Sequence, residues 1–277
     1  MCGICGIISS DKNDIVQERE IKIMTNLMKH RGPDGEGFFI KENIGLGHRR
    51  LAIIDLSERA SQPMGNEDGT LWITFNGEIY NYKDIRKELE KNHSFKSESD
   101  TEVILHAFEE WGINCLNKFR GPFAFGIFDF NKEQLFLARD HTGQKPLVYY
   151  FDKKNNKFYF ASEIKPILEV SHIKREINLK ALHLYFLHNF RHIPDPYTIF
   201  ENIFKLPPAS FLIFDLKVNQ IEIQRYWKPD FSKRKEGEEK LINYYKDLVK
   251  ECINLTEVSD VPIGILLSGG IDSSTIT

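Results

Sequence analysis

The hydrophobic positions of the first 162 residues fall into short runs that are rich in β-branched and aromatic side chains and bounded by turn residues. Such runs are typical of antiparallel strands. The expected strands are residues 4–9, 37–42, 44–48, 51–55, 71–75, 122–130, 134–140, 146–152 and 157–162. Apolar residues at helical spacing predict helices over 17–30, 83–92 and 101–112. The predicted strands and helices occur in separate groups along the chain, and do not alternate. This order predicts an α+β fold in which two antiparallel sheets pack together and helices lie outside.

The pattern changes after residue 215. Residues 216–237 combine Pro, Gly and alternating charge, which predicts a linker between a domain of residues 2–215 and a second segment of residues 238–277. The basic run within it, at 233–235, is followed by acidic residues and indicates solvated chain. Residues 238–255 then show the spacing of an amphipathic helix, which predicts that Cys252 is a buried core thiol.

The composition is that of a folded protein, with 41% hydrophobic and 28% charged residues in a chain of 277, a length that favours two domains. The formal net charge of −3 lacks the clustered positive field that nucleic acid requires. No apolar run is long enough to span a bilayer, and the first residues lack the features of a signal peptide. We therefore expect a cytoplasmic protein with no nucleic-acid or membrane partner.

Two of the four cysteines, Cys2 and Cys5, stand in the opening MCGICG and could belong to a zinc site, a redox pair or an N-terminal strand. A zinc site needs a second ligand pair at comparable spacing, and Cys115 and Cys252 stand alone. A redox CxxC normally opens a helix, whereas CGICGIIS favours a strand. We expect Cys5 and Cys115 to be core residues and Cys2 to have a different role.

A continuous apolar run, residues 261–267, is typical of a parallel strand covered on both faces, and SGGIDSS follows it. Glycines that let the backbone turn, free N–H groups at a helix start and hydroxyl donors together suit a pyrophosphate. The candidate anion-binding residues are Leu267, Ser268, Gly269, Gly270, Asp272 and Ser273, with Asp272 as candidate Mg²⁺ ligand. The loop resembles the PP-loop of the ATP pyrophosphatases, and it is not a Walker A loop because no Lys follows the second Gly.

The motifs MCGICG, HRGPDG, GHRRLAIID, FNGEIYNY, ESDTEVIL, GPFAFGIFD, RDHTGQKPL and FASEIK occur in the order seen in glutamine-hydrolysing asparagine synthetases. The chain resembles this family over essentially its whole length. The resemblance implies a class II glutamine amidotransferase domain with the N-terminal nucleophile fold, an α+β fold of four layers (αββα) with two antiparallel sheets. It also implies that the beginning of an α/β PP-loop ATP pyrophosphatase domain follows.

By this resemblance, Cys2 is the nucleophile that attacks the side-chain amide of glutamine and forms a thioester. Loss of Met1 would leave the α-amino group of Cys2 free, and its pKa near ~8 suits a general base. Asn76 and the N–H of Gly77 would form the oxyanion hole. The residues alone favour a type I′ hairpin turn at this Asn-Gly pair, and the two interpretations are compatible if the turn presents the donors.

The resemblance also assigns residues to the glutamine pocket. Arg50 would bind the α-carboxylate, and strand alternation would turn Arg49 to the opposite face. Glu78 and Asp100 would receive the α-ammonium group, although Asp100 could equally cap the helix that follows, as could Ser99. The pocket would also be lined by the main chain of Leu51, Ala52, Ile53 and Ile54.

The implied reaction uses ATP and Mg²⁺, with no prosthetic group, to adenylate aspartate, and ammonia from glutamine then displaces AMP to give asparagine, pyrophosphate and glutamate. Glutamine, aspartate and ATP are thus the expected partners, and a homodimer is compatible with the sequence. We expect residues 1–277 to hydrolyse glutamine without synthesising asparagine. Two alternatives are open: an amidotransferase that amidates another carboxylate, such as a sugar or polysaccharide precursor, and a non-catalytic glutamine sensor.

Overall fold

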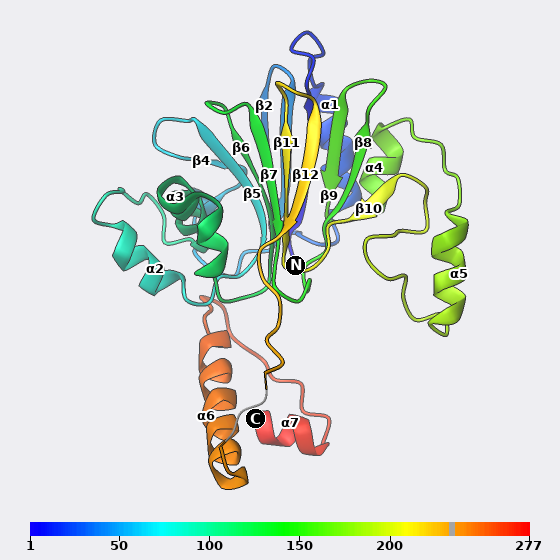
Figure 1. Ribbon diagram of the computed structural model, residues 1–277. Coiled ribbons are helices and arrows are strands. Elements are labelled where there is room, and N and C mark those ends of the chain that lie inside the picture. Colours follow the sequence, from blue (N-terminus) through cyan, green and yellow to red (C-terminus); the bar gives the residue numbers. More distant parts are fainter. Residues whose placement is uncertain (233–235) are drawn as a thin grey trace.

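The first 225 residues of this computed structural model, which describes residues 1–232 and 236–277, fold around two antiparallel sheets of six strands (Figure 1). Residues 233–235 of the predicted linker lie outside the described residues. In spatial order, the first sheet contains β10 (Ile203–Lys205), β8 (Val148–Asp152), β9 (Lys157–Ala161), β1 (Gly3–Ser9), β3 (Ile44–Arg50) and β2 (Gly35–Lys41). The second contains β12 (Gln220–Arg225), β11 (Ser210–Asp215), β7 (Gln134–Arg139), β6 (Phe123–Asp129), β5 (Leu71–Gly77) and β4 (Met64–Gly65).

Helices cover the outer faces of both sheets. The helices α1 (Glu18–Leu27) and α4 (Ile164–Val170) pack on the first sheet, and α2 (Tyr82–Leu89) and α3 (Asp100–Trp111) pack on the side of the second. Helix α5 (Leu179–Leu187) lies at the periphery, and two 3₁₀ helices span Glu58–Ala60 and Gly112–Asn117. The predicted four-layer αββα arrangement is therefore confirmed.

Strand β1 explains why the opening motif is so apolar. Every residue from Gly3 to Ser9 is buried, because the strand lies in the middle of a covered sheet. Ile4 and Ile8 belong to the core between the sheets, whereas Cys5 and Ile7 pack beneath α1. The side chains of a strand alternate between its two faces, so a strand buried on both faces is apolar throughout. Cys5 is a core thiol, as predicted, and Cys115 is one as well.

The sequence prediction was wrong about residues 51–55, which form a loop and not a strand. The guanidinium of Arg50 donates to the carbonyl oxygens of Asp55 and Ser57 and folds this segment back beyond the end of β3. The predicted linker also contains a strand, since β12 pairs with β11 along its whole length. The hydrophobic pattern predicted no elements between residues 163 and 215, where α4, α5, β10 and β11 occur.

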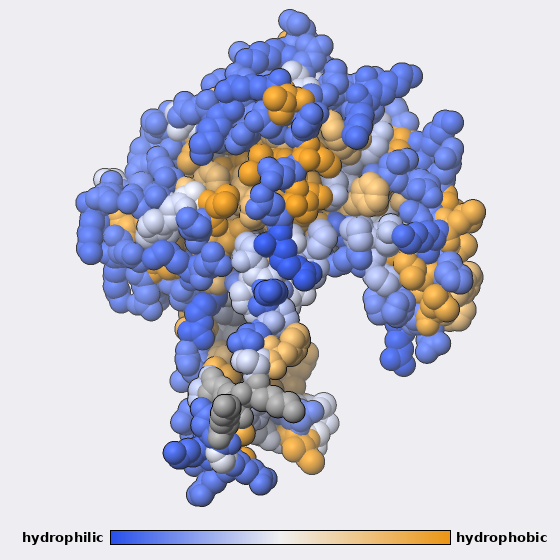
Figure 2. All heavy atoms as spheres, viewed as in Figure 1, coloured by the Kyte–Doolittle hydropathy of each residue, from blue (hydrophilic) through white to orange (hydrophobic). Residues whose placement is uncertain are grey.

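The second segment contains α6 (Glu238–Thr256) and the short helix α7 (Ile271–Ile276). Two predictions were wrong here: Cys252 is exposed, and residues 261–267 do not form a strand. A strand needs a hydrogen-bonded neighbour, which the described residues do not supply to residues 261–267, and no residue of α6 is buried. Figure 2 shows hydrophobic side chains at the surface here, and Leu266 is 95% exposed.

Asp260 joins this segment to the first domain. Its main-chain N–H donates to the carbonyl oxygen of Ile53 over 2.9 Å, and its carboxylate accepts from the N–H of Asp55 over 2.7 Å. Arg120 and Glu251 form an exposed ion pair nearby. Within the described residues, no helix has the length and apolar character needed to cross a membrane.

Candidate active site

A cavity of about 140 Å³ brings together most of the residues that the sequence assigns to glutamine. Its walls come from the start of β1, the loop after β3, the end of β5 and the start of α3. The predicted residues that line it are Cys2, Arg50, Leu51, Ile53, Ile54, Asn76, Gly77, Glu78 and Asp100. Ala52 does not line it, because its N–H turns away and donates to the carboxylate of Asp34 over 2.9 Å.

The thiol of Cys2 is held beside the backbone of the loop after β3. The N–H of Leu51 donates to the sulfur over 3.3 Å, and the thiol lies 3.6 Å from the carbonyl oxygen of the same residue. The main-chain carbonyl of Cys2 accepts from Nε of Arg31 over 2.9 Å, and Arg31 is paired with Glu163 at 3.2 Å. The motifs HRGPDG and FASEIK thus hold the N-terminal strand in place.

The first glycine of HRGPDG, Gly32, is required because its main chain lies very close to the end of β3. A Cβ on Gly32 would lie 2.4 Å from the main-chain carbonyl of Arg49 and 2.6 Å from the nitrogen of Arg50. Real Cβ contacts are never this short, so a side chain here would push β3 and its arginines away from Cys2. Asp34 in the same motif then fixes the following loop through Ala52.

The predicted alternation of the two arginines is confirmed. Arg49 points away from the cavity, where it donates to the carbonyl oxygen of Thr25 and pairs with Glu36. Arg50 lines the cavity. Since a guanidinium has five N–H donors and the carbonyls of the loop use two of them, the planar group can still donate to a ligand.

Burial disfavours the ionised form of the Cys2 thiol. It raises the thiol pKa, although the N–H of Leu51, the chain's amino group and Lys145 oppose this effect. The N-terminal amino group of the chain is that of Met1, next to Cys2. Its pKa is below its ordinary value because it is partly buried. A neutral thiol needs a base before it can act as a nucleophile, and an amine with a lowered pKa can accept a proton at neutral pH.

Asn76 and Gly77 end β5 and pair with Ala124 and Phe123, so the alternative of a type I′ turn at this pair is wrong. The side chain of Asn76 is on the same face of β5 as that of Thr74, whose hydroxyl donates to the carbonyl oxygen of Gly47 in the first sheet. Asn76 is only 1% exposed, and neither its amide nitrogen nor its amide oxygen has a hydrogen-bond partner among the described residues. This buried amide faces the cavity that contains the Cys2 thiol.

Two carboxylates form the acidic wall of the cavity. Ser99, and not Asp100, caps α3: its hydroxyl accepts from the N–H of Thr101 over 3.1 Å. Asp100 is thereby free to line the cavity, where it accepts from the N–H of Ile79 over 2.9 Å. Burial raises the pKa of Asp100 to about 7, and the charge of Glu78 adds to this shift. Burial also raises the pKa of Glu78, against the charge of Lys145.

Sequence reasoning did not assign several polar residues to the cavity, among them Lys145 and Gln62. Lys145 belongs to the motif RDHTGQKPL, and its positive charge opposes the raised pKa values of Cys2 and Glu78. Gln62 donates to the hydroxyl of Thr101 over 3.0 Å and accepts from the N–H of Phe75 over 2.7 Å, so it joins β5 to α3. Only the motif around Lys145 gave a signal in the sequence.

The candidate pyrophosphate residues lie together on the second segment. Gly269 has a φ of +78°, a Cβ added to it would meet no atom within 4 Å, and Gly270 precedes α7. The hydroxyls of Ser268 and Ser273 lie 2.9 Å apart across the turn. Asp272 instead borders a cavity along α6 with Lys246 and Ile253. The open, glycine-rich turn fits a phosphate, whereas Asp272 by itself offers Mg²⁺ few of its ligands.

Two family models match the chain: residues 1–227 match a glutamine amidotransferase domain, and residues 244–277 match asparagine synthase. A solved structure of glutamine phosphoribosylpyrophosphate amidotransferase from Bacillus subtilis aligns with a TM-score of 0.60, covering 82% of this chain and 50% of that one. At 19% sequence identity, this likeness shows the fold, which is the predicted N-terminal nucleophile fold.

Curated relatives align with the whole chain. It is 44% identical to the putative asparagine synthetase (glutamine-hydrolyzing) 2 of Methanocaldococcus jannaschii, of which it covers 56%. It is 41% identical to asparagine synthetase (glutamine-hydrolyzing) 1 of Bacillus subtilis, covering 43%, and 33% identical to Amidase chry2 of Gibberella zeae, covering 42%. The chain thus spans about half the length of the curated relatives it matches. With its N-terminal thiol, buried amide and paired carboxylates in one cavity, the chain belongs to the glutamine amidotransferase family, in the form that asparagine synthetases carry ahead of their synthase domain.

Proposed function

We propose that the cavity hydrolyses the side-chain amide of glutamine with Cys2 as the nucleophile. The observation that carries this proposal is the amide of Asn76, which is buried without a partner among the described residues, in the cavity that contains the Cys2 thiol. Burying an unsatisfied amide costs about 1–3 kcal/mol, a cost that a protein recovers when a ligand supplies the missing partner. The oxyanion of a tetrahedral intermediate is such a partner.

In the proposed reaction, the α-amine of Cys2 carries the proton of its own thiol. After removal of Met1, the free α-amine of Cys2 takes the thiol proton as the sulfur attacks the amide carbon. The amide N–H of Asn76 and the main-chain N–H of Gly77 donate to the oxygen as its charge develops. The same amine then protonates the departing nitrogen, so that ammonia leaves and a thioester remains. Attack by water on the thioester releases glutamate and restores the thiol.

The α-carbon end of glutamine is held by charge. Arg50 offers its remaining N–H donors to the α-carboxylate, whose planar geometry matches a guanidinium. Glu78 and Asp100 accept from the α-ammonium group on the opposite wall. The main chain of Leu51, Ile53 and Ile54 lines the space between them. These contacts require a free α-carboxylate and a free α-ammonium group. The cavity therefore recognises free glutamine and excludes a glutamine residue within a peptide.

We predict that glutamine binding weakens as the pH falls below about 7. The buried Asp100 is protonated below its pKa of about 7, whereas the α-ammonium of glutamine requires its ionised form. Linkage then lowers the affinity by up to about tenfold per pH unit. Calorimetry in a Cys2→Ala background, which blocks turnover, measures the dissociation constant between pH 5.5 and 8.5. Asp100→Asn in that background is expected to bind weakly and nearly independently of pH; an unchanged pH profile would contradict the assignment.

The proposed nucleophile is tested by 6-diazo-5-oxo-L-norleucine, an alkylating analogue of glutamine, followed by mass spectrometry and peptide mapping. We expect loss of Met1 and a single adduct on Cys2. The chain provides an internal control: Cys252 is exposed, so it is expected to react with iodoacetamide, but it does not line the glutamine cavity. An adduct on Cys252, no adduct at all, or a retained Met1 would each contradict the mechanism.

We propose further that the complete enzyme uses ATP and Mg²⁺ at the turn of Ser268 to Ser273 to adenylate aspartate, and that ammonia from Cys2 displaces AMP. The match of residues 244–277 to asparagine synthase and the open form of the turn support this proposal. Asp272 is proposed as one Mg²⁺ ligand among several. We also propose a cytoplasmic location, a homodimer, and glutamine hydrolysis without asparagine synthesis by residues 1–277.

A second candidate is amidation of another carboxylate, because relatives of comparable similarity include a protein named as an amidase. Two polar residues, Thr142 and Gln144, border a cavity between the first domain and α6, together with Cys252 and Leu255. Polar side chains at this boundary would suit an enzyme with another acceptor. Pyrophosphate release by the full-length protein, measured with aspartate and with uronic acids, separates the two acceptors. Turnover of glutamine itself separates both enzymes from a glutamine sensor.

A further inference from the structure

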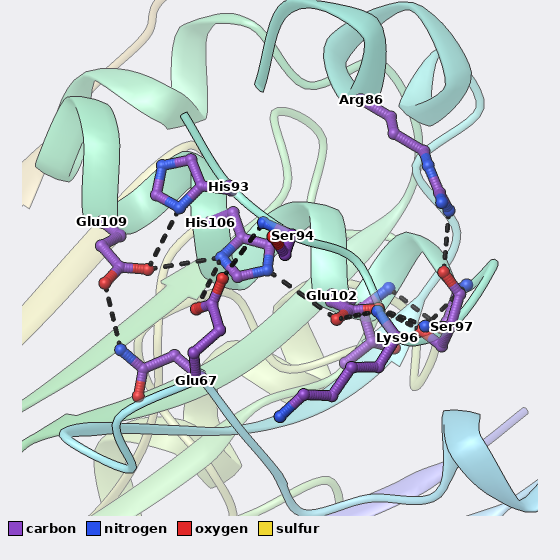
Figure 3. Close-up of polar contacts among 12 residues, drawn as sticks. Glu67, Arg86, His93, Ser94, Lys96, Ser97, Glu102, His106 and Glu109 are labelled. Carbon is purple, nitrogen blue, oxygen red and sulfur yellow. Dashed lines mark hydrogen bonds and ion pairs between the residues drawn. The ribbon is translucent and has the colours of Figure 1, made fainter. Parts of the chain in front are cut away.

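Four potential metal ligands converge at the outer surface of α3, away from the glutamine cavity (Figure 3). Glu67 comes from the loop between β4 and β5, and His93 from the loop after α2. His106 and Glu109 lie one turn apart on α3. The ligand atoms of the four side chains all lie within 4.8 Å of one another. The set contains two imidazoles and two carboxylates, so it is not merely an acidic patch.

Three of the distances between these atoms are close to those around a tetrahedral ion, and all of them are within 4.8 Å. Zn²⁺ binds His nitrogen and carboxylate oxygen at about 2.0–2.2 Å, which places neighbouring ligand atoms about 3.3–3.5 Å apart. Nδ1 of His106 lies 3.3 Å from Glu109 and 3.6 Å from Glu67, and Nδ1 of His93 lies 3.7 Å from Glu109. The two rings are stacked with their centroids 4.7 Å apart. We propose that these four residues bind a divalent cation of the zinc type.

The outer oxygens of both carboxylates are already held in place. Glu109 presents Oε2 to the histidines, while its Oε1 accepts from the side-chain amide of Asn66 over 3.1 Å. Glu67 presents Oε2 to His106, and its Oε1 accepts from the N–H of Ser94 over 3.3 Å. Contacts of this kind orient metal ligands in known sites. The carboxylates therefore need only small movements to meet an ion.

Both imidazoles likewise have a carboxylate behind them. Nε2 of His93 lies 3.3 Å from Glu110, and Nε2 of His106 lies 3.8 Å from Glu102. Glu102 is fixed in turn by the N–H groups of Lys96 and Ser97 and by the Ser97 hydroxyl (Figure 3). A carboxylate on the far nitrogen of a ligating histidine is the usual outer partner in zinc sites. Three of the four ligands thus have a hydrogen-bonded outer partner, and the Nε2 of His106 faces Glu102 at ion-pair distance, without a hydrogen-bond partner among the described residues.

The surrounding charge also favours a cation. His106 is only 1% exposed, and the carboxylates of Glu67, Glu102 and Glu109 lie within 3.8 Å of its ring. Glu67 and Glu109 remain partly exposed, so an ion can reach the cluster from solvent. Four protein ligands complete the coordination of Zn²⁺, which is the arrangement of a structural site and not a catalytic one. Binding would tie two surface loops to α3, the helix that begins with Asp100 of the glutamine pocket.

The test is a zinc titration of the full chain after removal of metal with EDTA, in competition with a chromophoric chelator. A Cys2→Ala, Cys252→Ala background removes the two accessible thiols. We expect one bound Zn²⁺ per chain, and with Co²⁺ the strong visible absorption of tetrahedral coordination. Glu67→Gln and His93→Ala are each expected to weaken Zn²⁺ binding by at least about 100-fold.

His188→Ala is the matched control. His188 and His192 form another close histidine pair, at 4.7 Å between ring centroids, but they belong to no cluster of three or more potential ligands among the described residues. This variant is expected to bind Zn²⁺ like the parent. Glu67 is exposed, so Glu67→Gln keeps the test independent of folding. The proposal is overturned if the parent fails to compete for Zn²⁺, which would leave the cluster as a set of side-chain contacts with no metal. It is also overturned if His188→Ala loses Zn²⁺ binding while Glu67→Gln and His93→Ala keep it.

Discussion

Replacing Cys2 with alanine is expected to abolish glutamine hydrolysis, with kcat reduced by roughly 10³-fold or more. Without the sulfur no thioester forms, and the oxyanion donors can assist only a slow attack by water. Cys2→Ser is expected to be nearly as inactive, because an amine with a pKa near ~8 is too weak a base to activate an alcohol efficiently. Glutamate release in an enzyme-coupled assay measures both rates.

Two controls separate loss of chemistry from loss of structure. The Cys2→Ala protein should still bind glutamine in calorimetry, because the carboxylate and ammonium contacts belong to other residues. Cys252→Ala, which removes an exposed thiol, should hydrolyse glutamine at the parental rate. Retention of more than a few per cent of activity by Cys2→Ala would show that another group is the nucleophile.

Asn76→Ala is expected to lower kcat by about 10²–10³-fold, or about 2.7–4 kcal/mol, with a much smaller change in KM. The amide has no partner among the described residues, so it is available to the substrate oxygen, and its hydrogen bond to that oxygen strengthens as charge develops there. For the same reason, the variant should unfold at an unchanged or higher temperature, because it no longer buries an unsatisfied amide.

Asn43→Ala is the matched control for this variant. Asn43 is also buried, but its side-chain amide donates to the carbonyl oxygen of Ser9 and joins two chain segments. Its removal should lower the free energy of unfolding by about 1–3 kcal/mol and leave kcat unchanged. If Asn76→Ala behaves in this way instead, the Asn76 amide is structural and the oxyanion must be stabilised elsewhere.

The fold could be predicted largely because most of its strands are buried on both faces and bounded by turn residues. The error at residues 51–55 has a local cause: Leu51, Ile53 and Ile54 are apolar because they line a pocket and pack on the core, and not because they belong to a sheet. The pattern of apolar residues cannot distinguish these reasons. The same limit applies to Cys252, which lies on an apolar helix face of which no residue is buried.

The residues of the candidate site could be predicted to lie together where a motif carried several of them. Lys145 was missed because only the folded chain shows that its loop approaches Cys2 and Glu78. The cluster around His106 was also invisible, since Glu67 and His93 come from separate loops and follow no ligand spacing. Conversely, the sequence could not decide between Ser99 and Asp100 as the cap of α3, because that choice depends on the hydrogen bond that the Asp100 carboxylate accepts from the main-chain N–H of Ile79.

The contact of Asp260 with Ile53 and Asp55 has a thermodynamic consequence for the two halves of the enzyme. It joins the segment after α6 to the loop that lines the glutamine cavity. If a ligand of that segment displaces Asp260, glutamine affinity changes by some factor, and glutamine must change the affinity of that ligand by the same factor. A single coupling free energy would then link the binding of glutamine to the binding of that ligand. It could be measured from the affinity of either one.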